Sequence, residues 1–216
     1  MTAKPFVVAA LLTGCGGGGG SSGGGGPTPP PPVVQYYLPL AVGNTWTYTC
    51  AYRNPPMAGS FTKTDSVTGT QTVNGVRTYV FALHIVNSPT QIITWNMLLA
   101  NDMQGNLTLY GYLVNGSVQT ITPIVIVAAN GTPGKQYTGY YYPAPDGSTV
   151  YRYFYGNELT NPTPLGTFRV AAYFENNGSW DTRGYGYTLG QGITEDSEAP
   201  NVPEQYDCLI NSIQLH

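Results

Sequence analysis

The chain has 216 residues, and only 9% of them are charged. With 8 basic and 11 acidic residues its formal net charge is −3. This sparse, slightly acidic charge argues against binding to nucleic acid and against electrostatic attraction to a membrane surface. The length suffices for one domain with a sizeable core.

Residues 1–14 predict a signal peptide. Lys4 supplies a positive charge, and residues 6–12 form an apolar run that is much shorter than the roughly 20 residues of a membrane-spanning helix. The sequence Leu-Thr-Gly-Cys at 12–15 resembles the lipobox of bacterial lipoproteins. The resemblance implies cleavage before Cys15 and acylation of that cysteine, which would anchor the chain in a membrane. The alternatives are an ordinary secretory peptide with a chance cysteine, or a start codon assigned too far downstream.

Residues 15–35 predict a tether between the anchor and a domain at 36–216. Residues 16–26 are only Gly and Ser, and residues 27–32 are Pro apart from Thr28. Such a segment has no side chains from which to build a core. The residue after the lipobox cysteine is Gly16. An aspartate at this position would resemble the signal that retains lipoproteins in the inner membrane. We therefore expect the outer membrane if the cell is Gram-negative, with the domain in the envelope and periplasm.

Two cysteines remain once Cys15 is assigned to the lipid. In an oxidising envelope compartment, Cys50 and Cys208 are expected to form a disulfide. A loop of this length predicts a contribution of more than about 4 kcal/mol on the chain-entropy model. Two buried free thiols are the alternative.

Apolar residues alternate with polar ones along several segments, which indicates half-buried β-strands. Residues 45–53, 76–86 and 166–175 show the pattern most clearly. The rows predicted to face a core are Trp46, Tyr48, Cys50 and Tyr52; Tyr79, Phe81, Leu83 and Ile85; and Phe168, Val170, Ala172 and Phe174.

Asn-Gly or Asp-Gly pairs stand between such segments and are typical of tight hairpin turns. They occur at 74–75, 115–116, 130–131, 146–147 and 177–178. No window of helical length keeps a helical apolar period without Gly or Pro. The sequence therefore predicts an all-β fold with about ten antiparallel strands, in a sandwich or a curved, partly open barrel.

The start of the domain carries a further resemblance. Residues 39–48 match the pattern P-L-x-x-G-x-x-W-x-Y that opens many uncharacterised bacterial lipoprotein domains, and Pro-Ile-Val-Ile at 123–126, Gly-Thr-Phe at 166–168 and Gly-Gln-Gly-Ile at 190–193 follow in the expected order. The resemblance implies a β-rich envelope module without a known reaction.

Candidates for chemistry are few. His84 is expected on the strand face opposite Phe81 and Leu83, where a structural role is favoured over a general base. No nucleophile elbow, zinc-protease helix or phosphate loop occurs, so we expect no catalytic residue and no cofactor.

An acidic group near the C-terminus has two interpretations. Its members could supply oxygen ligands to a hard cation, but their spacing is not that of a calcium loop, and a solvated acidic loop is favoured with no metal. The group comprises Glu195, Asp196 and Glu198, with Asp181 and Glu204 nearby.

Tyrosines flank the predicted turn at 146–147. Paired strands would set their rings on both faces of one hairpin, with one face in the core and the other available to a partner. Cross-strand packing alone is the simpler explanation. The candidate binding residues are Tyr140, Tyr141, Tyr142, Tyr151, Tyr153 and Tyr155.

The sequence therefore favours a non-enzymatic envelope lipoprotein, held in the membrane through Cys15, whose β-domain binds an envelope protein or a glycan and no nucleic acid. One alternative is a carrier of an apolar ligand such as a lipid, which requires a cavity in the domain. The other is a hydrolase with an unrecognised site.

Overall fold

The structure is a computed structural model that describes residues 34–52, 59–88, 91–129, 140–176, 182–199 and 206–216. The chain divides into a segment Met1–Val33 and a compact unit Val34–His216. The predicted signal peptide, Cys15 and nearly all of the predicted tether lie outside the described residues. The described part contains no helix that is long and apolar enough to cross a membrane.

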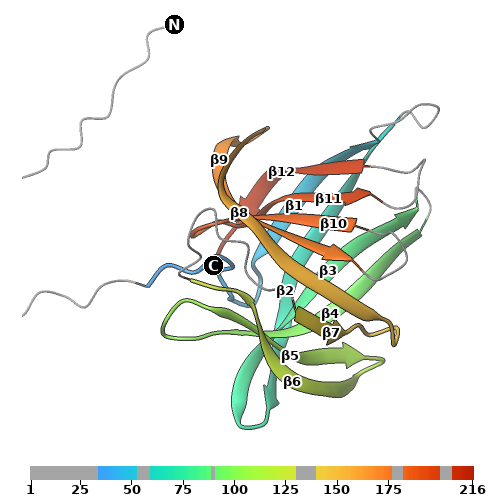
Figure 1. Cartoon of the computed structure of the whole chain (residues 1–216), viewed down its shortest axis with the longest axis vertical. Helices are drawn as coiled ribbons and strands as arrows, with labels where there is room; N and C mark the ends of the chain where they lie inside the picture. The colour runs from blue at the N-terminus through green and yellow to red at the C-terminus, as the bar shows by residue number, and fades with distance from the viewer. Residues whose placement is uncertain (1–33, 53–58, 89–90, 130–139, 177–181, 200–205) are drawn as a thin grey trace, which may run out of the picture. The chain divides into compact units, whose positions relative to one another are not determined.

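Twelve antiparallel strands form one sheet, which curls into a nearly closed barrel (Figure 1). The order across the sheet is β6-β5-β4-β3-β2-β1-β12-β11-β10-β9-β8-β7, so β1 and β12 pair in the middle and β6 and β7 are the two edges. The all-β prediction is confirmed: of its two alternatives the structure shows the curved, partly open barrel, with two strands more than the roughly ten expected. The strands are β1 (Thr45–Tyr52), β2 (Ser60–Val73), β3 (Val76–Ser88), β4 (Gln91–Asn101), β5 (Leu107–Val114), β6 (Ser117–Val127), β7 (Tyr140–Pro143), β8 (Thr149–Thr163), β9 (Gly166–Asn176), β10 (Thr182–Thr188), β11 (Gly192–Ala199) and β12 (Tyr206–Gln214).

The main hydrophobic core fills the inside of the barrel. Because side chains alternate across a strand, every second residue points inward. On β1 these are Trp46, Tyr48 and Cys50, and on β3 they include Phe81 and Leu83, all buried. The rows predicted for residues 45–53 and 76–86 are therefore confirmed.

The prediction for β9 is wrong about which face is buried in the core. Ala171, Tyr173 and Glu175 face the interior. Val170, Ala172 and Phe174, predicted for the core, lie on the outer face. Glu175 faces inward because Arg152 of β8 contacts it there. Outside, a methyl group on Gly184 would lie only 3.0 Å from the Phe174 ring, so this glycine leaves room for the ring against the sheet.

Two of the predicted hairpin turns have the expected backbone. Asn74 and Gly75 have φ angles of 51° and 79°, and Asn115 and Gly116 have φ angles of 50° and 77°. These positive values are typical of a type I′ turn and match the twist of the strands that it joins. The pair at 146–147 also lies in a turn, whereas the pairs at 130–131 and 177–178 lie outside the described residues.

The segment before β1 packs against one end of the barrel. The Leu38 side chain is buried in the core and its carbonyl oxygen accepts a hydrogen bond from Asn101 Nδ2 at 2.9 Å. The Gly190 N–H donates to the Tyr36 carbonyl at 2.8 Å. These contacts just before the predicted opening motif thus fix the entry of the chain into the barrel.

The disulfide expected from the sequence is present. Cys50 and Cys208 are directly opposed on β1 and β12, bonded, and buried inside the barrel. They are 158 positions apart, so the bond links the beginning and the end of the domain.

Candidate functional site

The tyrosines of the β7–β8 hairpin divide between two environments. Tyr142 is buried in the core, whereas Tyr141 is 70% exposed. The Tyr141 ring lies beside that of Tyr151, with 4.8 Å between the ring centroids. The hairpin therefore presents the Tyr141 ring to solvent, packed against the half-buried Tyr151 ring. For Tyr140, Tyr153 and Tyr155 the structure describes the backbone alone, so their predicted binding role lies outside the described side chains.

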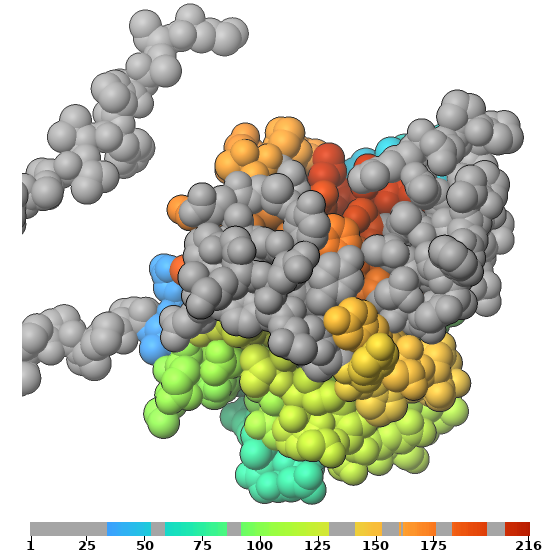
Figure 2. All heavy atoms as spheres, viewed as in Figure 1, coloured from blue at the N-terminus to red at the C-terminus, as the bar shows by residue number. Residues whose placement is uncertain are grey.

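A groove of about 490 Å³ lies where the barrel closes, between β6 and the turn after β7. We call it the seam groove. Figure 2 shows the two parts meeting, with β5 and β6 in yellow-green and the β7–β8 turn in amber. Its volume is within the roughly 300–1,000 Å³ of ligand-binding clefts. Its lining residues are Tyr112, Gln119, Thr120, Ile121, Pro143, Ala144, Pro145, Asp146 and Gly147.

The seam groove is almost uncharged, and Asp146 is its single acidic lining residue. Hydrogen bonds from Ser148 hold the pKa of Asp146 below its usual value. The hydroxyl of Tyr112 is buried and has no hydrogen-bond partner among the described residues.

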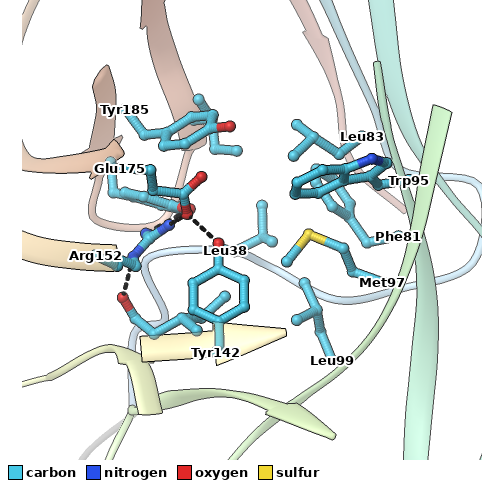
Figure 3. Close-up of a pocket in the computed structure, with 13 residues that line it drawn as sticks. Leu38, Phe81, Leu83, Trp95, Met97, Leu99, Tyr142, Arg152, Glu175 and Tyr185 are labelled. Atoms are coloured by element: carbon cyan, nitrogen blue, oxygen red, sulfur yellow. Dashed lines mark hydrogen bonds and ion pairs between the residues drawn. The ribbon is translucent and has the colours of Figure 1, made fainter. Parts of the chain in front are cut away.

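Inside the barrel, Arg152 forms a buried polar network (Figure 3). Its guanidinium contacts Glu175, donates to the Ile126 carbonyl at 3.1 Å and donates to the Tyr187 hydroxyl at 3.1 Å. The Tyr142 hydroxyl donates to Glu175 Oε1 at 2.6 Å. Burial raises the pKa of Tyr142 well above its usual value, and the Glu175 charge raises it further. The network therefore links β6, β7, β8, β9 and β10, and the raised pKa keeps its Tyr142 hydroxyl protonated.

A second buried group of charges joins β2 to β11. Lys63 Nζ contacts Asp196 Oδ2 and lies 3.4 Å from Asp65 Oδ2, and all three side chains are nearly inaccessible to solvent. Lys63 also donates to the His84 carbonyl at 2.9 Å, and the His84 N–H donates to Asp65 Oδ1 at 2.8 Å. The Lys63 and Asp65 side chains thus make hydrogen bonds to the β3 backbone at His84, beyond the last regular β2–β3 pair, Ser66 and Ala82.

The predicted acidic loop is wrong, because residues 192–199 form strand β11. Asp196 is buried and paired with Lys63, and Glu195 lies on the outer face. Asp181, Glu204 and the side chain of Glu198 lie outside the described part. Within the described residues, no group of three or more His, Cys, Asp or Glu side chains is placed to hold a metal ion.

His84 has partners that the sequence did not indicate. Its Nδ1 lies 3.5 Å from Asp65 Oδ1, and the side chain is about 30% exposed. The histidine lies at the rim of the buried Lys63 group.

The enclosed cavity detected in the described core is about 10 Å³ in volume. That is about the space of one water molecule. Figure 3 shows its walls, which include Leu38, Met97 and Leu99 beside the Arg152 network. The cavity that an apolar-ligand carrier requires is therefore not found in the described core, since ligand sites are far larger.

The sequence-based reading missed Lys63, Asp65, Arg152 and Glu175. The sequence does contain a pattern for two of them. Lys63, Asp65 and Val67 are every second residue of one segment and alternate with polar residues such as Thr62 and Thr64. A charged row on an amphipathic strand is ordinarily assigned to solvent, so the period alone does not distinguish a charged interior.

No protein-family model matches the chain, and no curated protein matches it. Among solved structures, the chain is similar to a Bacteroides fragilis protein designated as exported with a YmcC-like fold, at 12% identity and a TM-score of 0.47, over 84% of this chain and 100% of that one. It is also similar to a Parabacteroides distasonis protein designated as a lipoprotein, at 14% identity and a TM-score of 0.43, over 85% and 100% of the two chains. The fold described above rests on this chain's own strand order and pairing.

Proposed function

We propose that this chain is a lipid-anchored envelope protein whose barrel is a non-catalytic binding module for a neutral glycan. The observation that carries the proposal is the exposed Tyr141 ring, which packs on the half-buried Tyr151 ring near the seam groove. Tyr141 and Pro143 share the outer face of β7, and Pro143 lines the groove. One ligand could therefore contact both features.

The chemistry of this surface favours a neutral glycan. Tyrosine offers an apolar ring face together with a hydroxyl, which suits a sugar ring with its C–H and O–H groups. The groove adds Gln119 and Thr120 and a single carboxylate. A charged polymer would need several opposite charges, which this lining lacks.

The proposal of a non-catalytic module is supported by the position of the titratable groups. Lys63, Asp65 and Asp196 lie inside the barrel and are closed to solvent. A general base must come within hydrogen-bond reach of a substrate proton, and these groups are shielded from a bulky substrate.

Binding of the full-length protein to purified envelope glycan tests the proposal. We expect Tyr141→Ala and Tyr151→Ala each to weaken binding about tenfold, the effect of removing one interfacial anchor. Leu165→Ala is the matched control, because Leu165 is exposed in the β8–β9 turn away from the groove residues. Equal binding by all four proteins contradicts the proposal. If the protein instead captures a protein partner, and this capture depends on Tyr141, the proposal of a binding module stands and the proposal of a glycan ligand is contradicted.

The lipid anchor needs its own test. We expect Cys15→Ser to move the protein from the membrane fraction to the soluble fraction, since acyl chains on Cys15 would supply the attachment. Cys50→Ser is the control, because it removes a cysteine inside the barrel. Membrane retention of the Cys15→Ser protein would contradict lipidation at this residue.

A further inference from the structure

We propose that Lys63 and Asp196 form an intramolecular amide bond, with Asp65 as the proton relay. The two reacting side chains come from β2 and β11, which are separated in the sheet by β1 and β12. Their side chains are in direct contact inside the barrel, although they are 133 positions apart in the sequence. The bond would be a covalent modification of the barrel and is independent of the proposed binding function.

The pairing of the strands fixes this contact. Lys63 is the cross-strand partner of Tyr48 on β1, and Asp196 is the cross-strand partner of Cys208 on β12. The Lys63 Nζ lies 4.9 Å from the centre of the Tyr48 ring, which shields it from water. The reacting groups are thus held together by the sheet before any bond forms, which replaces an encounter in solution.

The electrostatics of the site favour the protonated, reactive form of Asp196. Burial raises the pKa of Asp196 above its usual value, Lys63 opposes this effect, and the Asp65 charge adds to it. Asp196 Oδ1 is buried without a hydrogen-bond partner among the described residues. A carboxylate with an unpaired oxygen is costly in a dry interior, whereas an amide there carries no charge.

The reaction is a condensation in which one water leaves. After proton transfer within the ion pair, the Lys63 amine attacks the Asp196 carboxylic carbon, and a C–N bond forms. Asp65, whose Oδ2 lies 3.4 Å from Nζ, takes a proton from the nitrogen. It returns that proton to the departing hydroxyl as the C–O bond breaks. Asp65 ends as it began, nothing is oxidised or reduced, and no co-reactant is needed.

The product would keep one contact that the structure already shows. The Lys63 nitrogen donates to the His84 carbonyl at 2.9 Å, and an amide N–H can make the same bond. The Arg152–Glu175 pair is equally buried, but a guanidinium stays protonated and is not a nucleophile. The same barrel therefore contains a matched pair that cannot condense.

Peptide mapping of the full-length protein tests the bond directly. The protein is unfolded, reduced, alkylated and digested, and the peptides are weighed by mass spectrometry. In most chains we expect the peptide with Lys63 to be joined to the peptide with Asp196, with a mass lower than their sum by one water. Peptides with Arg152 and Glu175 should remain unjoined. Unmodified Lys63 and Asp196 in most of the folded chains would overturn the proposal.

Two variants separate the roles. Lys63→Arg keeps the positive charge and should give no joined peptide. Asp65→Asn should slow the joining by about 10²-fold or more, the contribution usual for general acid–base catalysis, with the disulfide and the far-UV circular dichroism unchanged. Joining at the normal rate in Asp65→Asn overturns the relay role of Asp65. Peptide mapping of the unmutated protein shows whether the Lys63–Asp196 bond forms even if one of these variants does not fold.

Discussion

Charged residues inside the barrel are the main feature at the scale of single residues. Arg152 and Glu175 are 1% and 4% exposed, yet each has partners that replace water. Replacing a buried ion pair with apolar residues is often neutral, whereas removing one partner leaves a buried charge alone. The network is therefore sensitive to single changes.

Glu175→Ala should lower the free energy of unfolding by about 3–5 kcal/mol, because it leaves the Arg152 guanidinium buried without its counter-ion. Tyr142→Phe is the control, since it removes one hydrogen bond to Glu175 and should cost about 1–2 kcal/mol. Urea unfolding followed by tryptophan fluorescence measures both. A Glu175→Ala loss no larger than that of Tyr142→Phe would show that Arg152 finds water or another partner.

Tyr173 makes stability fall at alkaline pH. Burial raises the pKa of its hydroxyl from 10.0 to about 12. Because the folded protein holds this proton more tightly, the contribution is complete below pH 10 and is lost as the pH rises from 10 to 12. By pH 11 the loss should be about 1 kcal/mol. Urea unfolding of the native protein and of Tyr173→Phe at pH 8 and 11 measures it; the Tyr173→Phe protein should lose less, and identical losses would contradict the assignment.

At the scale of strands and turns, local sequence rules explain most of the elements. Asn-Gly pairs make the β2–β3 and β5–β6 turns. The β10–β11 turn needs more than a permissive backbone. Trp46 Nε1 donates to the Gln191 carbonyl at 2.5 Å, and the indole lies against Gly192.

Gly192→Ala should destabilise the barrel much more than Gly190→Ala. Both glycines have positive φ, at 95° and 76°, so each substitution strains the backbone by about 1 kcal/mol. A methyl group at Gly190 meets nothing within 4 Å, whereas at Gly192 it would lie 2.3 Å from Trp46 Nε1. The clash should add about 1–3 kcal/mol. Thermal unfolding of the two variants compares them, and equal shifts would mean that the indole moves aside freely.

At the scale of the whole molecule, the barrel is held by the pairing of its first and last strands. β1 and β12 lie side by side and carry the Cys50–Cys208 disulfide. Next to them, β2 and β11 carry Lys63 and Asp196. Among the strands that the structure describes, β6 and β7 are the two edges of the sheet, and the seam groove lies between them.

In a Lys63→Arg background, replacing both Cys50 and Cys208 with serine should lower the free energy of unfolding by roughly 4–5 kcal/mol, since a long loop is no longer closed in the unfolded chain. In the native background the proposed Lys63–Asp196 bond already closes most of this loop, so the loss should be smaller. The serine pair should therefore cost more in a Lys63→Arg background than in the native one. Denaturant unfolding of the four proteins measures this coupling.

The sequence by itself determined the elements of this protein. Strands are predicted by the alternation along residues 45–53 and 76–86, and turns by the Asn-Gly pairs at 74–75 and 115–116. A disulfide is predicted because two cysteines, Cys50 and Cys208, remain once Cys15 is assigned to the lipid. The strand and turn patterns are local, and the disulfide prediction depends only on the number of cysteines. None of these predictions depends on the order of the strands in the sheet. The Asp-Gly pair at 146–147 and its flanking tyrosines also predict a hairpin with rings on both faces, though not which ring is exposed.

Only the tertiary structure decided which residues meet. The contact between Lys63 and Asp196 depends on the order β2-β1-β12-β11 and on the register of each pair, which no local pattern encodes. The same holds for Glu175, whose face is set by Arg152 on the neighbouring strand. A charged residue on an alternating strand is stable outside in water or inside with a partner, and the partner is chosen by the closed barrel.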